Sequence, residues 1–357
     1  MSYSLALGPF HPMWRGPQRF ILRVDGERVA DLEYRDGYNE RGCAERLPRL
    51  DLPQALFLVS RICGTCSIAH TLAFCQALES LCGLAVPDRA AWLRSAAAEL
   101  ERACSHLAAA ATTLEALGLD VHAASLRDMR ETTLGAMNRL AGARLAPDFC
   151  IPGGVRRNLA PSDREDILLT LPKQSRALYR VIEGLIDSRT LLARSVDVGA
   201  LPRTAAEQYG VRGPQARASG IGRDARADHP YAAYNALPFR LITQEGGDLY
   251  ARLLVLMLEA YESMKLADAA LQNLPAGDWQ GEFPALKRGT ASSAVEGPHG
   301  MIRYAIESDG ERLTKTRIDT PRQLDRLLAR TLLAGALVDN VVPIIASCDV
   351  CTACAEQ

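Results

Sequence analysis

The chain has 357 residues, of which 48% are hydrophobic and 23% charged, and its formal net charge is −1. This composition is typical of a folded protein and excludes a disordered chain, and the balanced charge gives no electrostatic reason to expect nucleic acid as a partner. No stretch of about 20 apolar residues predicts a membrane span. The N-terminus lacks a secretory signal pattern, so we expect a cytoplasmic protein.

The first two thirds of the chain begin with β structure and continue as helices. Strands are expected between residues 4 and 35, with a turn at Asp25-Gly26-Glu27. Asp88 is expected to cap the second of the following helices, which Gly118 ends, and Pro172 is expected to interrupt the fourth. The expected helices span 71–81, 88–116, 123–141, 162–194 and 248–272.

The remaining segments contain more loops. Residues 200–240 are rich in Gly and Pro, and such a long connection is usually functional or packed into a site. Residues 289–300 are expected to form a loop, residues 301–317 a hairpin around Asp309-Gly310, and residues 321–338 the last helix. We therefore predict a mainly α fold with small β elements (α+β). We expect a single domain over 1–357, made of a β-rich region (1–50), a helical core (51–290), and a hairpin, last helix and C-terminal tail (291–357).

Two Cys-x-x-Cys pairs stand out among the ten cysteines. They are Cys63 with Cys66 and, at the opposite end of the chain, Cys351 with Cys354. This spacing lets both sulfurs of a pair reach one metal ion, and four thiolates would make a soft metal site. His70 lies one helical turn after Cys66 and is a candidate hydrogen-bond partner of a thiolate.

Other interpretations of these cysteines stay open. A thioredoxin-like redox motif needs a strand and helix around the pair, and a structural zinc site usually has its two pairs about 15–20 residues apart. Zinc remains possible for two pairs this distant. The other cysteines are expected to be buried apolar side chains, although Cys348 is a possible extra ligand and Cys43 has no assigned role.

Sequence motifs at both ends resemble those of nickel–iron hydrogenase large subunits. The resemblance covers nearly the whole chain and is strongest to the membrane-bound, energy-converting branch, which is related to the large quinone-site subunit of respiratory complex I. The modest length of the chain also suits that branch. The motifs are Gly8-Pro9-Phe10-His11-Pro12, Arg41-Gly42, Arg61-Ile62-Cys63-Gly64-Thr65-Cys66-Ser67-Ile68-Ala69-His70, Pro152-Gly153-Gly154-Val155-Arg156-Arg157, Arg217-Ala218-Ser219-Gly220, Asp248-Leu249-Tyr250-Ala251-Arg252 and Asp349-Val350-Cys351-Thr352-Ala353-Cys354.

The resemblance implies a hydrogenase-like fold with a central helical bundle and a Ni-Fe centre whose iron carries carbon monoxide and cyanide. Cys63 and Cys351 would bind nickel, and Cys66 and Cys354 would bridge both metals. The implied reaction is the reversible conversion of H2 into two protons and two electrons. The implied partners are a small iron–sulfur subunit, other soluble subunits and antiporter-like membrane subunits, with the chain peripheral on the inner face of the membrane.

Three positions depart from the hydrogenase pattern. Ala44 stands where the family has a proton-gating Glu, and Glu45 is about 100° away on a helix. His299 replaces an Arg near the iron and has fewer hydrogen-bond donors. Val350 replaces a Pro and is expected to loosen the turn before Cys351. These departures leave two alternatives open: a quinone-linked subunit without hydrogenase activity, and a structural zinc protein.

Overall fold

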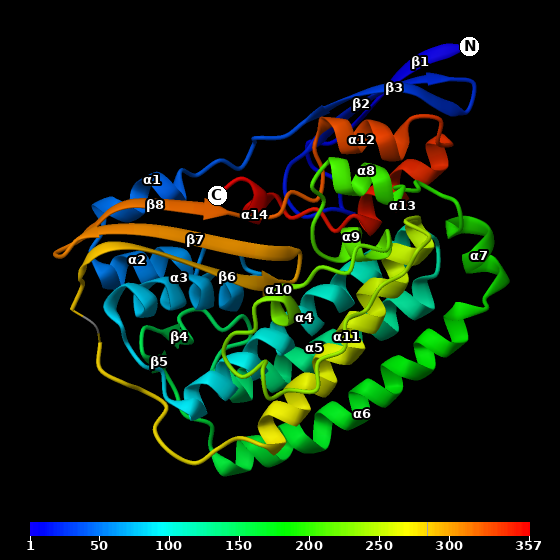
Figure 1. The fold of residues 1–357 in the computed structure, drawn as a ribbon. Helices are drawn as coiled ribbons and strands as arrows, with labels where there is room; N and C mark the ends of the chain where they lie inside the picture. Colours follow the sequence, from blue (N-terminus) through cyan, green and yellow to red (C-terminus); the bar gives the residue numbers. More distant parts are fainter. Residues whose placement is uncertain (284) are drawn as a thin grey trace.

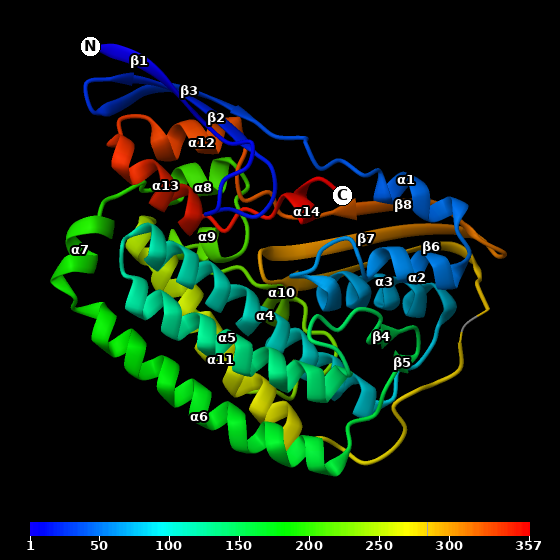
Figure 2. The same cartoon turned by 180° about the vertical axis from the view of Figure 1, so that it is seen from behind.

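Four long helices form the centre of the fold in the computed structural model, which describes residues 1–283 and 285–357 (Figure 1). Helix α4 (Asp88–Ala116) packs against α5 (Asp120–Ala141) and α11 (Leu249–Gln272), and α6 (Pro161–Ile186) packs against α5 and α11. Figure 2 shows the same bundle from behind. The expected α+β class with a central helical bundle is confirmed.

Helix ends follow local sequence signals with two exceptions. Gly118 has a left-handed φ of 70° just after α4, as expected of a helix terminator. Asp88 is already the first residue of α4 and does not cap it, since Pro87 precedes the helix without a side-chain bond. Pro172 lies inside α6 without ending it, and the break before α7 (Arg189–Ser195) falls at Asp187 instead.

A three-stranded antiparallel sheet packs against α3 (Ser67–Cys82). Its strands are β6 (Arg288–Gly297), β7 (Gly300–Asp309) and β8 (Leu313–Asp319), so the expected hairpin around Asp309 is confirmed. The expectation of a loop over 289–300 is wrong, because β6 occupies most of it. Its small side chains allow a close approach to α3, where Ser293 donates a hydrogen bond to the Ala73 carbonyl at 2.5 Å, and this tertiary contact outweighs a weak strand propensity.

The N-terminal sheet consists of β1 (Ser2–Leu7), β2 (Arg19–Asp25) and β3 (Arg28–Arg35) and packs against α12 (Arg326–Leu333). The expectation of a last helix over 321–338 is wrong. Asp325 caps α12 and a left-handed Gly335 follows it, after which α13 (Val338–Ser347) and α14 (Thr352–Ala355) continue to the C-terminus.

Short elements complete the structure. Residues 200–240, all of which the structure describes, are loop-rich as expected and contain three short helices. No described helix is both long and apolar enough to cross a membrane. The short elements are α1 (Cys43–Arg46), a 3-10 turn (Leu47–Arg49), α2 (Leu52–Val59), β4 (Cys150–Ile151), β5 (Gly154–Val155), α8 (Arg203–Gln208), α9 (Pro214–Ala218) and α10 (Ala225–Asp228).

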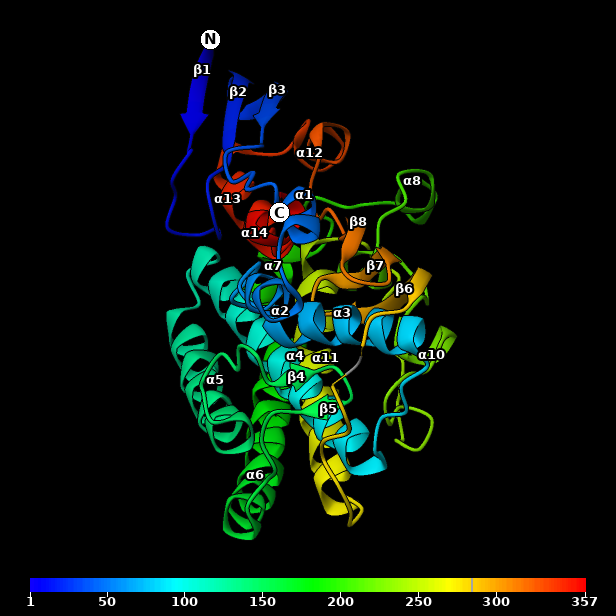
Figure 3. The same ribbon diagram turned by 90° about the vertical axis from the view of Figure 1, so that its left-hand side faces the viewer.

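The segment around Arg15 meets the C-terminal segment that carries the second cysteine pair. Helix α14 lies between the N-terminal sheet and the β6–β8 sheet, as Figures 1 and 3 both show. A parallel β-bridge joins Arg15 to Cys351, and the Thr352 hydroxyl donates to the Arg15 carbonyl at 3.4 Å. This placement brings the C-terminal cysteine pair next to α3 and therefore next to the first pair.

Candidate metal centre

The first cysteine pair lies in the turn between α2 and α3. Cys63 follows the end of α2, and Cys66 is the residue directly before α3, so the turn points both side chains to one side. Both are buried, at 3% and 0% exposure. The Thr65 backbone N–H donates to the Cys63 sulfur at 3.4 Å, which holds that sulfur against its own turn.

The second pair lies at α14 and faces the first. Cys351 precedes α14 and Cys354 lies within it, and both are buried. The sulfurs of Cys63 and Cys351 are 3.4 Å apart. The Arg41 guanidinium spans the two segments, because it donates to the carbonyls of Ile62 and Ala353, each at 2.7 Å.

The sulfur atoms form two overlapping groups of possible metal donors. Cys63, Cys351 and Cys354 make one group, and Cys66, Cys354 and His299 make the other, with donor atoms within 4.8 Å of one another in each. Thiolates around a four-coordinate metal at about 2.3 Å lie roughly 3.8 Å apart, so the soft donor set fits a thiophilic metal. Cys354 belongs to both groups, whereas Cys66 belongs to one.

The four thiols differ in acidity. Hydrogen bonds from Cys351 and Cys354 lower the pKa of Cys63. Burial opposes ionisation of Cys66, but hydrogen bonds from Cys354, Cys63 and His299 outweigh it and lower the pKa of Cys66. Hydrogen bonds with Cys351, Cys63 and Cys66, together with burial, raise the pKa of Cys354 well above its ordinary value.

His299 lies in the two-residue turn between β6 and β7, between the cysteines and a carboxylate. Its Nδ1 is 3.2 Å from the Cys66 sulfur, and its Nε2 is 3.1 Å from Asp349 Oδ2. Burial disfavours the charged ring, but Cys66 and Asp349 outweigh burial and raise the pKa of His299 well above its ordinary value. The imidazole is therefore a cation here, which retains the charge of the Arg that it replaces.

The turn before Cys351 accommodates this arrangement. Asp349 has a left-handed φ of 49° and also lies 3.4 Å from Arg15. A proline at position 350 would confine Asp349 to extended conformations, so Val350 permits the backbone that points the carboxylate at His299. Val350 was expected to loosen this turn; in the structure the turn has a left-handed residue at Asp349.

His70 contacts the second pair and not the first. Its Nε2 lies 3.4 Å from the Cys354 sulfur, and its Nδ1 lies 2.8 Å from the Tyr304 hydroxyl. Burial lowers the pKa of His70 to about 4, so the ring is neutral. His70 was expected over the first pair, but the structure places it against the sulfur of Cys354 in the second pair. Tyr304 on β7, which no sequence motif indicated, orients the ring.

Position 44 carries no carboxylate near the cluster. Ala44 is half-buried in α1, and Glu45 is exposed, so the expectation that Glu45 does not replace the missing glutamate is confirmed. The single cysteines behave as expected, since all are buried and none belongs to either donor group among the described residues. Cys348 donates to the Ile344 carbonyl at 3.3 Å and is packed inside the protein.

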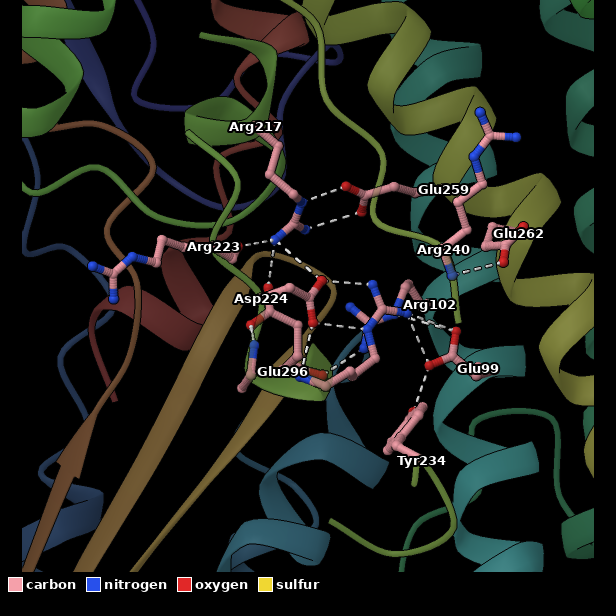
Figure 4. Close-up of polar contacts among 12 residues, drawn as sticks. Glu99, Arg102, Arg217, Arg223, Asp224, Tyr234, Arg240, Glu259, Glu262 and Glu296 are labelled. Carbon is pink, nitrogen blue, oxygen red and sulfur yellow. Dashed lines mark hydrogen bonds and ion pairs between the residues drawn. The ribbon is translucent and has the colours of Figure 1, made fainter. Parts of the chain in front are cut away.

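A buried ion-pair network lies beside this site (Figure 4). Arg217 in α9 contacts Glu259 on α11 at 2.5 Å and Glu296 near the end of β6 at 2.8 Å. Glu259 in turn lies 3.0 Å from His106 Nε2. The charge of Arg217 overcomes burial and holds the pKa of Glu259 well below its usual range, and Asp224 completes the group around Arg217 at 3.4 Å.

The other half of the network fixes the hairpin that carries His299. Arg102 on α4 donates to the carbonyls of Glu296 and Gly297, at 2.6 and 2.7 Å. Arg226 lies 3.0 Å from Glu99, which also accepts from Tyr234. The loop-rich segment 200–240 is therefore packed beside a site, as expected. Its Arg217 pairs with Glu296, and Arg102 of α4 holds the end of β6 before His299.

Comparisons with known proteins agree with this geometry. The chain is 32% identical to the carbon monoxide-induced hydrogenase of Rhodospirillum rubrum, covering 100% of this chain and 99% of that protein. A profile described as the respiratory-chain NADH dehydrogenase 49 kDa subunit matches residues 117–286. The chain belongs to this family of membrane-bound hydrogenase large subunits and complex I 49 kDa subunits. The suspected family is confirmed.

Further relatives include two hydrogenase-related subunits and a chain of a solved respiratory complex. The chain is 32% identical to formate hydrogenlyase subunit 5 of Escherichia coli over 98% of its own length, but it spans only 62% of that relative. It is 30% identical to the membrane-bound hydrogenase subunit alpha of Pyrococcus furiosus, covering 99% of this chain and 87% of that protein. A solved archaeal membrane-bound sulfane sulfur reductase complex has a chain with a TM-score of 0.92 and 26% identity, covering 100% of this chain and 98% of that one.

Proposed function

We propose that this chain is the catalytic large subunit of an energy-converting nickel–iron hydrogenase, acting as a single domain over residues 1–357. The observation that carries the proposal is the convergence of two cysteine pairs from opposite ends of the chain, with Cys63 and Cys351 sulfurs 3.4 Å apart. The similarity to a carbon monoxide-induced hydrogenase over the full length supports it.

The cysteines would hold a Ni-Fe centre whose iron carries carbon monoxide and cyanide. Cys63 and Cys351 would bind nickel alone, and Cys66 and Cys354 would bind both metals; the membership of Cys354 in both donor groups supports this assignment. When bound, the centre supplies the redox chemistry that interconverts H2 with two protons and two electrons. All four sulfurs are buried, and thiolate ligands favour soft metals.

Two histidines would complete the catalytic surroundings. His299, paired with Asp349, places a buried positive charge 3.2 Å from Cys66, which favours the thiolate that a metal needs. Neutral His70 is held by Tyr304 and contacts Cys354. Such contacts orient metal ligands and adjust their basicity.

The electrons would pass to a small iron–sulfur partner subunit. Other soluble subunits and antiporter-like membrane subunits would complete the assembly, with this chain in the cytoplasm, peripheral on the inner face of the membrane. The names of the relatives, which include a membrane-bound hydrogenase subunit and a formate hydrogenlyase subunit, support a place in such a complex.

Metal content and hydrogen turnover of the purified complex test this proposal. We expect nickel and iron in the wild type, loss of nickel and of hydrogen turnover in C351S, and neither loss in C82S, whose buried cysteine lies outside both donor groups. Zinc alone would support a structural metal site. A metal-free complex that reduces quinone or sulfane sulfur without hydrogen turnover would contradict the hydrogenase proposal.

A further inference from the structure

A buried glutamate on α4 holds the start of the helix that follows the first cysteine pair. Glu101 is 7% exposed, and its carboxylate accepts from the backbone N–H groups of Ile68 at 2.7 Å and Ala69 at 3.0 Å. Cys66, which precedes α3, supplies no capping side chain. Glu101 therefore satisfies N–H groups that would otherwise be unpaired at this helix end.

The same glutamate lines a cavity whose wall includes the two residues between the cysteines of the first pair. The cavity has a volume of about 80 Å³, and its wall includes Gly64, Thr65 and Ser105. A single ordered water needs roughly 10–15 Å³ of such space, so the cavity has room for several. Arg144, which is exposed, also lines it and connects the cavity to the surface.

Thr65 links this cavity to the thiols. Its hydroxyl oxygen lies 3.2 Å from the Cys63 sulfur, 3.8 Å from Cys66 and 3.9 Å from Cys351. A hydroxyl both accepts and donates a proton. The wall of the cavity thus combines a carboxyl group, a hydroxyl group in contact with the cluster, and space for water.

We propose that Glu101 carries protons between the water in this cavity and the cysteine cluster through the Thr65 hydroxyl, in place of a carboxylate at position 44. The inference deepens the proposed function and rests on it, because hydrogen chemistry needs a proton route. Ala44 offers no proton-carrying group, whereas Glu101 and Thr65 share one cavity beside the thiols.

The transfer balances without any redox step. The Glu101 carboxyl passes its proton through cavity water to the Thr65 oxygen, as the Thr65 hydroxyl proton passes to the Cys63 sulfur. The carboxylate then takes a proton that the solvent supplies through the cavity water, which restores Glu101 and Thr65, while the proton stays on the Cys63 sulfur until the formation of H2 consumes it. The reverse sequence carries protons outward when H2 is oxidised.

The surroundings of Glu101 support this role. Burial raises the pKa of Glu101 to about 8, although the N–H groups of Ile68 and Ala69 oppose the rise. Charges face it from several elements: Cys63 raises the pKa and Arg102 lowers it, and Arg15, Arg130 and Arg144 line the same cavity. A group that carries protons works best when its pKa lies near the operating pH.

Substitutions at two positions separate a proton relay from a helix cap. T65V keeps the shape of the side chain but removes the hydroxyl, and T65S restores it; neither touches the cap on α3. E101Q removes the proton-carrying group. The matched control is E131Q, because Glu131 is an exposed glutamate paired with Arg130 at 3.2 Å and with Arg144 at 2.6 Å beside the cavity.

We measure nickel content, the infrared bands of the iron ligands and hydrogen turnover in the assembled complex, together with the C=O stretch of the protonated carboxyl as pH is varied. We expect E101Q and T65V to lower turnover about a hundredfold with nickel and infrared bands unchanged, and T65S and E131Q to resemble the wild type. A carboxyl band that is present below pH 8, fades above it and is absent from E101Q would identify the relay group.

The remaining outcomes overturn the inference. Full hydrogen turnover in T65V excludes the hydroxyl route. This conclusion does not depend on E101Q, which fails to load nickel if Glu101 serves only as the cap of α3. Wild-type turnover in E101Q excludes the carboxyl. A nickel-free, inactive wild type overturns the proposed function and the relay together, whereas an active wild type with equally active variants overturns the relay alone.

Discussion

The Nδ1 atom of His299 lies 3.2 Å from the Cys66 sulfur, and its Nε2 lies 3.1 Å from Asp349. One imidazole therefore joins a candidate metal ligand at the start of α3 to a carboxylate two residues before Cys351. Because both neighbours are anionic when ionised, they keep His299 positively charged in spite of its burial.

Loss of this charge should weaken metal binding. We expect H299Q to lower the nickel affinity about tenfold, because contacts that orient ligands typically contribute this much, and H299R to keep more of it because Arg retains the charge. Nickel bound per chain at limiting nickel checks this. H122Q, which changes a histidine on α5, is the control. Equal nickel affinity in H299Q and the wild type would contradict this role of His299.

His70 should make stability depend on pH. Its folded pKa of about 4 lies below the ordinary value of 6.5, so the unfolded chain binds a proton that the folded chain excludes. Its contribution to stability is fully present above pH 6.5 and is lost as pH falls toward 4, by about 3 kcal/mol in all. Urea unfolding of the metal-free chain between pH 7 and 4 should show a smaller pH dependence in H70Q than in the wild type. An equal pH dependence of the unfolding free energy in H70Q and the wild type would contradict the conclusion that His70 is neutral in the folded chain.

Arg41 should hold the two cysteine segments together. Its guanidinium donates to the carbonyls next to Cys63 and Cys354, and a lysine cannot reproduce a planar fork of donors. We expect R41K to increase the alkylation rate of Cys354 in the metal-free chain several-fold, as measured by mass spectrometry. R46K, at an exposed arginine that lies in α1 and follows Arg41 closely in the sequence, is the control. Equal Cys354 protection in R41K and R46K would exclude the bridging role.

The buried network should dominate the electrostatic contribution to stability near the site. R217M removes the partner of Glu259 and Glu296 and leaves buried carboxylates unpaired, which costs about 3–5 kcal/mol. R203M breaks only an exposed pair with Glu207 and should cost less than about 0.5 kcal/mol. The free energies of unfolding in urea compare the two. Similar losses would show that the Arg217 network contributes little.

Local sequence signals predicted the long helices well and the segments around the site less well. Gly118 and Asp248 marked helix ends, since capping depends on neighbours in the chain. The strand over 288–297 was missed because Ser293 and its small neighbours have a weak strand propensity, and the strand forms by pairing with β7 and packing against α3. The helix after Leu337 was missed because Asn340 and Pro343 obscured its pattern.

The cysteine pairs and His70 could be predicted from motif spacing, and His299 from the resemblance to the hydrogenase pattern. The partners that hold them could not. Arg15, Tyr304 and Glu101 come from segments far from the cysteines in sequence, and only the packing of three distant parts of the chain brings them together. Arg41 had a signal, since it belongs to a motif of the resemblance, but its contacts with both cysteine segments needed the structure.

The infrared spectrum of the purified complex tests the central claim most directly. A Ni-Fe centre held by Cys63, Cys66, Cys351 and Cys354 predicts the stretching bands of iron-bound carbon monoxide and cyanide in the wild type and their absence in C354S. A wild-type spectrum without these bands, from protein that carries zinc or no metal at the four cysteines, would contradict the hydrogenase proposal.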